Sequence, residues 1–304
     1  MPVPDDLLGA VVRGATPIGL AAIGELVVER SGVINIGLEG AISVGAVVAT
    51  VAAAAAGPAA GLLAGAGAGL ALSLVFGLFV TRLRAQQVIA GTAISMLGLG
   101  IAATMHRSLL AGTDDVHVPT LPSFPVPGFD RLPLIGSAFF DQPVPTYVLY
   151  LIVPLVAGML YRTVAGVALR AVGESPLAAR GAGRDPQRIQ IAAITFGGML
   201  AGLAGATLVV AQAGVFADGI SAGRGFIAIA VVALGGWTVR GVVAGSLLFG
   251  AVSATQYLVQ SYGSGVPYNL LLAMPYVVTL VALAALRGAQ AAPAALGRAI
   301  EGPP

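Results

Sequence analysis

The sequence lacks cysteine and lysine altogether and is poor in charged side chains of either sign. Without cysteine, the chain has no disulfide, no thiolate metal site and no cysteine nucleophile. Its 304 residues carry only 15 basic and 13 acidic side chains, too few to cover the surface of a soluble protein of this length. All of the basic residues are arginines scattered among short loops, a distribution that membrane topology explains better than nucleic-acid binding does.

The apolar content is correspondingly high: 57% hydrophobic residues, 43 glycines and a mean hydropathy of +0.94. This composition is typical of a polytopic membrane protein. Since a membrane helix needs roughly 20 apolar residues, we expect an all-α transmembrane bundle of about 8–10 segments, including broken or re-entrant helices. The bundle is expected to form one domain over residues 1–304. The predicted spans are 8–28, 34–56, 61–80, 88–106, 144–161, 189–213, 225–239, 241–261 and 268–286.

The arginines predict which helix ends face the cytoplasm, because short cytoplasmic loops retain more Lys and Arg than outer loops do. Five arginines lie in the loop 162–188, and others follow the third, seventh and last spans. These ends and the tail 287–304 are therefore predicted to be cytoplasmic. The segment 107–143 is rich in proline and aspartate and is predicted to lie outside. Nine complete spans put the N-terminus outside as well, whereas one broken span brings it inside.

Glycine and alanine dominate several spans, notably 61–79 and 196–210. Small residues let helix backbones approach closely in lipid, so these stretches are predicted to be packing faces. Segments 37–46 and 197–206 share a glycine-rich pattern. Such a pattern would fit a chain built from two related halves, as many transporters are.

The polar residues offer no arrangement typical of an enzyme. His106 and His117 fit no metal-ligand spacing, and the glycines of 32–40 match neither a phosphate loop nor a dinucleotide fingerprint. The chain is therefore predicted to perform no chemistry and to hold no metal or cofactor.

Polar residues within the spans are the remaining candidates, because polar groups in hydrocarbon usually face a bundle interior or a water-filled path. These residues either line a translocation path or make structural hydrogen bonds between helices. Glu29 and Arg30 are expected to pair at a helix end, and Asp218 and Arg224 to be peripheral. The absence of basic residues in mid-span favours a neutral polar solute. The candidate pathway residues are Glu25, Asn35, Glu39, Gln256 and Asn269.

The most specific pattern is the polar segment 168–183, ALRAVGESPLAARGAG. Gly173 is expected to break a helix, Ser175 and Pro176 to begin a second short one, and Gly181 to close it. The segment resembles the coupling helix of permease subunits in ATP-binding-cassette (ABC) importers for branched-chain amino acids, simple sugars and nucleosides. By that resemblance, the residues that contact the ATPase are Gly173, Glu174, Pro176, Ala178, Ala179 and Gly181.

Three further stretches narrow the resemblance. ERSGVINIGLEGAISVGA (29–46), SAGRGFIAIAVVALGGW (221–237) and AMPYVVTLVALA (273–284) are similar to segments of the shorter permease subunit of nucleoside importers. The chain departs from that pattern at Gly236, where a basic residue is expected.

The resemblance implies a machine of several components in the cytoplasmic membrane of a prokaryote. This chain and a second, different permease subunit would form the path, and a separate ATPase would bind ATP and Mg²⁺. An extracytoplasmic binding protein would deliver the solute, and the outer segment 107–143 is either a docking surface for it or a passive connector. A simple-sugar importer of the same superfamily is one alternative. The other is an ion-coupled secondary carrier, for which Glu25 and Glu39 are the best candidates.

Overall fold

The computed structural model describes residues 4–110, 117–128, 136–261, 268–285 and 292–298. Within these ranges, seven helices are long and apolar enough to cross a membrane, which agrees with the predicted all-α bundle. They are α1 (Pro4–Arg30), α2 (Leu38–Ala56), α3 (Pro58–Thr81), α4 (Gln87–Met105), α6 (Val144–Arg162), α9 (Pro186–Thr207) and α11 (Val239–Ser261).

The remaining elements are shorter or lie at the two ends of the bundle. α10 (Arg224–Leu234) is a half-length apolar helix, and α12 (Tyr268–Ala285) follows α11. Short elements complete the described chain: η1 (His106–Leu110), β1 (Phe124–Pro125), α5 (Gly136–Phe140), β2 (Asp141–Gln142), α7 (Val164–Glu174), α8 (Pro176–Gly181) and η2 (Leu208–Ala213).

The predicted spans correspond to helices with two informative differences. The second begins at Leu38, not at 34, because residues 31–37 form a break between α1 and α2. The seventh is only the half-helix α10. The first continues through Pro17, which has no N–H to donate to the carbonyl of Arg13. The side chain of Gln212 satisfies that carbonyl instead, with Nε2 at 2.8 Å from the oxygen.

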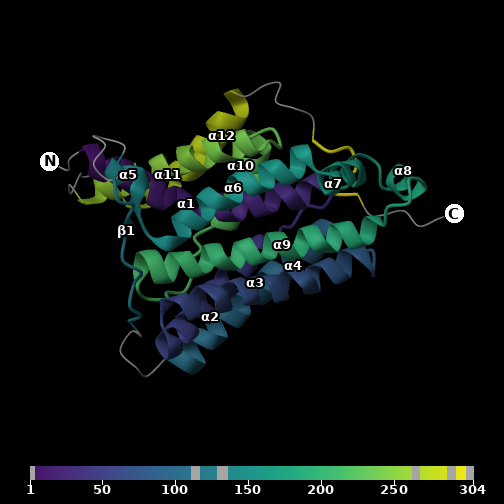
Figure 1. Cartoon of the computed structure of the whole chain (residues 1–304). Helices are drawn as coiled ribbons and strands as arrows, with labels where there is room; N and C mark the ends of the chain where they lie inside the picture. Colours follow the sequence, from purple (N-terminus) through teal and green to yellow (C-terminus); the bar gives the residue numbers. More distant parts are fainter. Residues whose placement is uncertain (1–3, 111–116, 129–135, 262–267, 286–291, 299–304) are drawn as a thin grey trace.

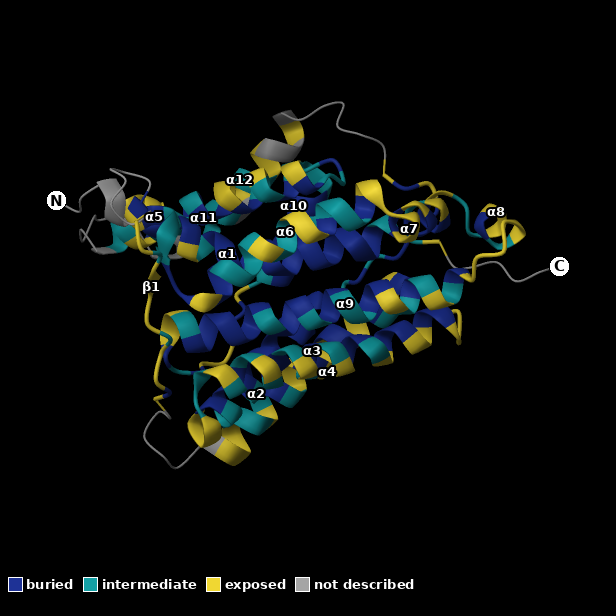
Figure 2. Cartoon of the chain, viewed as in Figure 1, coloured by how far each residue is buried: buried dark blue, intermediate teal, exposed yellow. Residues whose placement is uncertain are grey.

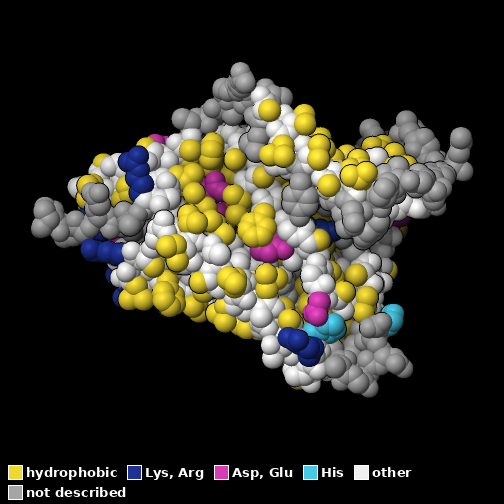
Figure 3. Space-filling view, turned by 180° about the vertical axis from the view of Figure 1, so that it is seen from behind, with side chains coloured by type: hydrophobic (Ala, Val, Ile, Leu, Met, Phe, Trp, Pro, Cys, Tyr) yellow, Lys and Arg dark blue, Asp and Glu magenta, His cyan; other side chains and the backbone are white. Residues whose placement is uncertain are grey.

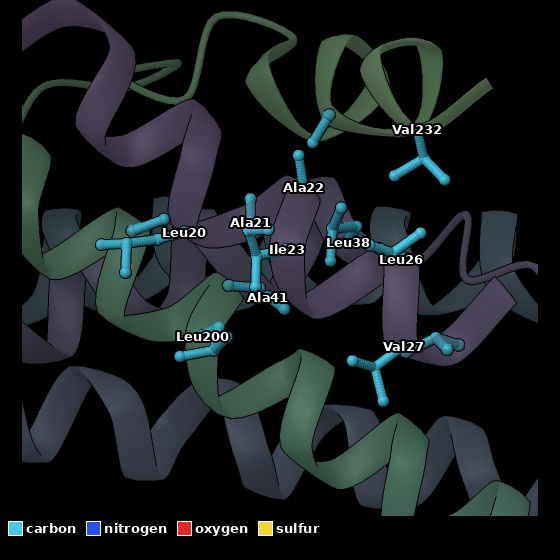
Figure 4. Packing of buried hydrophobic residues seen from close by; sticks show 14 of the residues in the cluster. Leu20, Ala21, Ala22, Ile23, Leu26, Val27, Leu38, Ala41, Leu200 and Val232 are labelled. Carbon is cyan, nitrogen blue, oxygen red and sulfur yellow. The ribbon is translucent and has the colours of Figure 1, made fainter. Parts of the chain in front are cut away.

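α1 lies at the centre of the bundle. Figure 1 shows α2, α3, α4 and α9 on one side of it and α10, α11 and α12 on the other, with α6 running across it in this view. Figure 4 shows side chains of α1, such as Ile23, Leu26 and Val27, packing against residues of α2, α9 and α10. α1, α2 and α9 are buried over 67%, 72% and 78% of their spans, whereas the other four spans are 22% to 39% buried. The contrast, visible in Figure 2, marks three core helices and four that face outward.

The glycine-rich stretches are packing faces, as predicted. A β-carbon on Gly45 would lie 2.5 Å from the backbone of Gly202, and one on Gly205 would overlap the carbonyl oxygen of Ile42. α2 and α9 therefore touch backbone to backbone, and α3 meets α9 in the same way at Gly69. The segments 37–46 and 197–206, similar in composition, lie against each other.

The two ends of the bundle differ in composition. The C-terminal end of α1 contacts α7 and residues 295–297, on the end that carries the arginine-rich loop. The opposite end carries β1, β2 and α5, and α1 begins there (Figure 1). With α10 counted as one broken crossing, the helices alternate between the two ends. This arrangement puts the start of α1 on the predicted outer side.

Candidate functional site

The half-helix α10 is held at both ends by residues that flank the break between α1 and α2. At its N-terminal end, Glu39 is buried and accepts two backbone hydrogen bonds, from Gly223 N–H at 2.9 Å and Gly225 N–H at 2.7 Å. A carboxylate is well placed there, because the first N–H groups of a helix have no partner within the helix and carry partial positive charge. Glu39 thus caps a helix that starts inside the bundle.

At the other end of α10, Trp237 binds two residues at the end of α1. Its indole N–H donates to Glu29 Oε2 at 2.5 Å, and its carbonyl accepts from Arg30 Nε at 2.8 Å. Trp237 has φ 52°, which is unusual for a bulky side chain, so these contacts hold a strained backbone. The predicted pairing of Glu29 with Arg30 is wrong: among the described residues both bind Trp237, and no ion pair joins them.

Glu25 and Asn35 lie between these two anchor points and are fully buried. Glu25 Oε1 accepts the backbone N–H of Asn35 at 2.9 Å, which fixes the break between α1 and α2. Glu25 Oε2 and both side-chain amide atoms of Asn35 have no hydrogen-bond partner among the described residues. Unpaired polar atoms at such depth are costly and often belong to functional sites.

A pocket of about 350 Å³ opens beside the N-terminal end of α10. It lies between the middle of α1, the start of α10, the outer half of α11 and the middle of α12. Discontinuous helices that end near mid-membrane are typical of solute sites in transporters. Its lining includes four polar side chains and is made by Ile18, Ala222, Arg224, Ile227, Ser253, Gln256, Tyr257 and Pro275.

The pocket is lined by one residue that was predicted to belong to the pathway, Gln256, and by one that was predicted to be peripheral, Arg224. Arg224 was predicted to be peripheral, but it is half-buried and lines the same pocket. Its guanidinium is held by the carbonyls of Ile220 and Ser221 at 2.9 and 3.2 Å. The glycines that flank Arg224 in the sequence were the available signal, since they begin a broken helix.

The other predicted pathway residues lie elsewhere. Glu25, Asn35 and Glu39 are not in the lining of the pocket. Asn269 belongs to α12, and its side chain lies outside the described part of the chain. Asp218 is exposed at the outer end, where its carboxylate lies 3.0 Å from His106 Nδ1.

The face of the bundle in Figure 3 is largely apolar. Apart from acidic atoms near its middle, the charged side chains on this face lie toward its two ends. Two aromatic side chains in this region are exposed: Tyr257, which lines the pocket, is 60% exposed, and Phe226, two residues after Arg224, is 49% exposed. A surface of this kind suits contact with lipid or with another membrane subunit.

The loop predicted to couple to an ATPase forms two helices at the arginine-rich end. Ser175 caps α8, its Oγ accepting the N–H of Ala178 at 3.2 Å, and Pro176 takes the first helical position, as predicted. Gly173 does not break a helix, because α7 runs through it to Glu174. Gly173 is needed instead for close packing: a β-carbon there would overlap the carbonyl oxygen of Arg30.

The six residues predicted to contact the ATPase differ in their exposure to solvent. Gly173 and Ala179 are buried, with Ala179 only 3% exposed, and so cannot meet a partner directly. Pro176 is half-buried. Glu174, Ala178 and Gly181 are exposed on α7 and α8, which project from the bundle in Figure 1.

The sequence matches a known family of transport proteins and is similar to several named permeases. The family described as "Branched-chain amino acid transport system / permease component" matches residues 7–283. A putative glucose ABC transporter permease protein of Haloferax volcanii is 36% identical over 281 residues, covering 90% of this chain and 85% of the relative. A guanosine ABC transporter permease protein of Bacillus subtilis is 31% identical, covering 96% and 95%. A nucleoside ABC transporter permease protein of Lactococcus lactis is 30% identical, covering 93% and 92%.

Proposed function

Because the chain belongs to the family of branched-chain amino acid transport system permease components, we propose that it carries nucleosides through the pocket beside α10. It is a multi-pass membrane subunit of an ABC transporter and not an enzyme, as the sequence predicted. Its family works with an ATPase and a substrate-binding protein. The membrane is the cytoplasmic membrane of a prokaryote, and ATP and Mg²⁺ are bound by the ATPase.

The pocket at the start of α10 is the observation that carries this proposal. Its volume of about 350 Å³ falls within the range of about 300–1,000 Å³ that is typical of small-molecule sites. Ser253 and Gln256 offer hydroxyl and amide groups that can both donate and accept hydrogen bonds, and Arg224 adds donors. Tyr257 contributes an aromatic ring.

This combination suits a nucleoside, which has a flat aromatic base and a hydroxylated sugar. The ring of Tyr257 is available for stacking on the base, and the polar groups match its carbonyl and nitrogen atoms and the ribose hydroxyls. Two of the relatives are named for guanosine and nucleoside transport, which supports the same solute class.

A simple sugar is the second candidate, because one relative is named as a putative glucose permease. A sugar would use the hydroxyl and amide groups of the pocket and leave the aromatic ring without a matching base. Uptake measurements separate the two solutes directly.

Transport requires the path to open alternately to the two sides, and α10 is the element placed to do this. It borders the pocket at one end and is tied at the other to Glu29 and Arg30, close to the coupling loop. A displacement of the α1–α2 segment by the ATPase shifts α10 and changes the pocket. Glu25 and Asn35, whose side chains keep polar atoms without a partner among the described residues, then contact the solute.

We expect a second, different permease subunit to complete the path. The exposed aromatic residue Phe226 in the first turn of α10 supports this, because a partner helix would cover it. We expect the binding protein to dock on the segment 107–143, of which residues 111–116 and 129–135 lie outside the described part of the chain.

The experiment is uptake of radiolabelled nucleosides and sugars by proteoliposomes that contain the complete importer, with an ATPase-dead complex as the control. Nucleoside uptake that disappears with the dead ATPase is the expected result. Sugar uptake that disappears in the same way would replace nucleoside by sugar as the solute. Uptake of either solute that persists with the dead ATPase would contradict the proposal.

A further inference from the structure

Residues 292–298 lie against the junction of α7 and α8, the two helices of the coupling loop. The N–H of Ala295 donates to the carbonyl of Gly173 at 2.9 Å, and the N–H of Ala294 donates to Glu174 Oε2 at 3.3 Å. Gly173 and Glu174 form the last residues of α7, immediately before α8. The segment near the C-terminus is therefore hydrogen-bonded to the junction of the two coupling helices.

The same segment is bonded to the break between α1 and α2. The N–H of Gly297 donates to the carbonyl of Gly32 at 3.3 Å. Gln87, at the start of α4, donates from Nε2 to the carbonyl of Arg298 at 2.9 Å and accepts the N–H of Ile34 at 2.8 Å. Ile34 precedes Asn35, which is held by Glu25. A continuous set of hydrogen bonds thus runs from the α7–α8 junction to the buried acid beside α10.

A hollow of about 200 Å³ lies between α8 and this segment. Both elements contribute to its wall, so neither would form it alone. Leu177 is 54% exposed there, and the exposed residues Glu174 and Arg298 supply charges of both signs. The full lining is Glu174, Ser175, Pro176, Leu177, Ala294, Ala295 and Arg298.

From this arrangement we infer that residues 294–298 form the second half of the surface that docks the ATPase subunit, with a side chain of the ATPase seated in the hollow. The inference rests on the proposed function, in which α8 is the coupling helix. The hollow is continuous with the exposed face of α8 at the predicted cytoplasmic end. A site that combines apolar side chains with polar side chains of both charges is typical of a protein interface rather than of lipid contact. Movement of the ATPase then reaches the α1–α2 break through both α7 and residues 294–298.

The absence of cysteine permits a direct test by thiol labelling of single-cysteine variants in proteoliposomes. Ala294→Cys puts a thiol in the hollow. Ala178→Cys puts one on the exposed face of α8 and reports on the proposed function alone. Ala217→Cys, exposed at the outer end, is the control. The rate of maleimide labelling is measured for each variant with and without the ATPase subunit.

We expect the ATPase to slow labelling at residues 294 and 178 by about tenfold or more and to leave residue 217 unchanged. Protection at 178 without protection at 294 would overturn the inference and leave the proposed function intact. If the ATPase slows labelling at neither residue 294 nor residue 178, the assignment of α8 as the coupling helix is wrong.

A functional variant complements the labelling. Ala294→Trp fills the hollow, whereas Ala292→Trp changes an exposed residue of the same segment that does not line it. The first is expected to reduce co-purification of the ATPase and ATP-driven uptake by about tenfold, and the second to leave both unchanged. Wild-type co-purification and uptake with Ala294→Trp would refute a docked side chain in the hollow.

Discussion

The carboxylate of Glu39 provides the sharpest test of the role of α10. Its two oxygens accept the N–H groups of Gly223 and Gly225 at 2.9 and 2.7 Å, and the side chain is 5% exposed. Glu39→Ala leaves both N–H groups without this acceptor. Because an unsatisfied buried donor costs about 1–3 kcal/mol, the start of α10 should be destabilised by about 2–6 kcal/mol.

Glu39→Gln separates hydrogen bonding from side-chain size. The glutamine keeps one oxygen acceptor, but its amide nitrogen meets the second N–H donor without a bond. We expect a loss of about 1–3 kcal/mol for that donor. A further loss of about 0.3–1 kcal/mol comes from removing negative charge at a helix N-terminus. The expected order of stability is therefore wild type, then Gln, then Ala.

Two measurements report the effect: the melting temperature of the purified importer and ATP-driven nucleoside uptake in proteoliposomes. Both should fall in that order, since Arg224 and the pocket lie in the first turn of α10. Thr92→Ala is the matched control, because the Thr92 hydroxyl is exposed and bonds only to the carbonyl of Val88 in its own helix. Wild-type melting and uptake in Glu39→Ala would refute the argument that this carboxylate holds α10.

Three other substitutions have defined outcomes. Gln256→Leu removes the amide from the pocket and should raise the KM for nucleoside about tenfold, equivalent to about 1.4 kcal/mol, whereas the exposed neighbour change Thr255→Val should leave uptake kinetics unchanged. Gly205→Val forces a side chain into the backbone of α2 and should prevent accumulation of folded protein, while Gly67→Val, with open space around it, should accumulate normally on an immunoblot. Trp237→Phe removes the N–H donor from a buried carboxylate and should cost about 1–3 kcal/mol; an unchanged melting temperature would show that this bond contributes nothing.

The membrane helices were predictable from sequence because each depends on a local property. A run of apolar residues long enough for the bilayer identifies α3, α4 and α6 within a few residues of their ends. Ser175 and Pro176 predicted the start of α8, since capping acts within one helical turn. The all-α class and the resemblance of the coupling loop both follow from the sequence alone.

The candidate site was only partly predictable, because its residues are brought together from distant parts of the chain. Gln256 was recognised as a polar residue in a span, but nothing near it in sequence indicates Arg224 or the pocket that they share. Gly173 was read as a helix breaker because glycine often ends helices. Its close approach to the carbonyl of Arg30 requires two helices far apart in sequence.

The sequence by itself determined that this protein is a multi-pass helical membrane protein, because hydrophobic length, arginine placement and turn residues act locally, and its resemblance to known permeases supplied the function. Only the tertiary structure decided that α10 is held at both ends by residues flanking the α1–α2 break, Glu39 of α2 at one end and Glu29 and Arg30 of α1 at the other. It also brought residues 294–298 against α7. The physical reason is that buried carboxylates and backbone N–H groups must find partners, and which partners they find depends on how the helices pack.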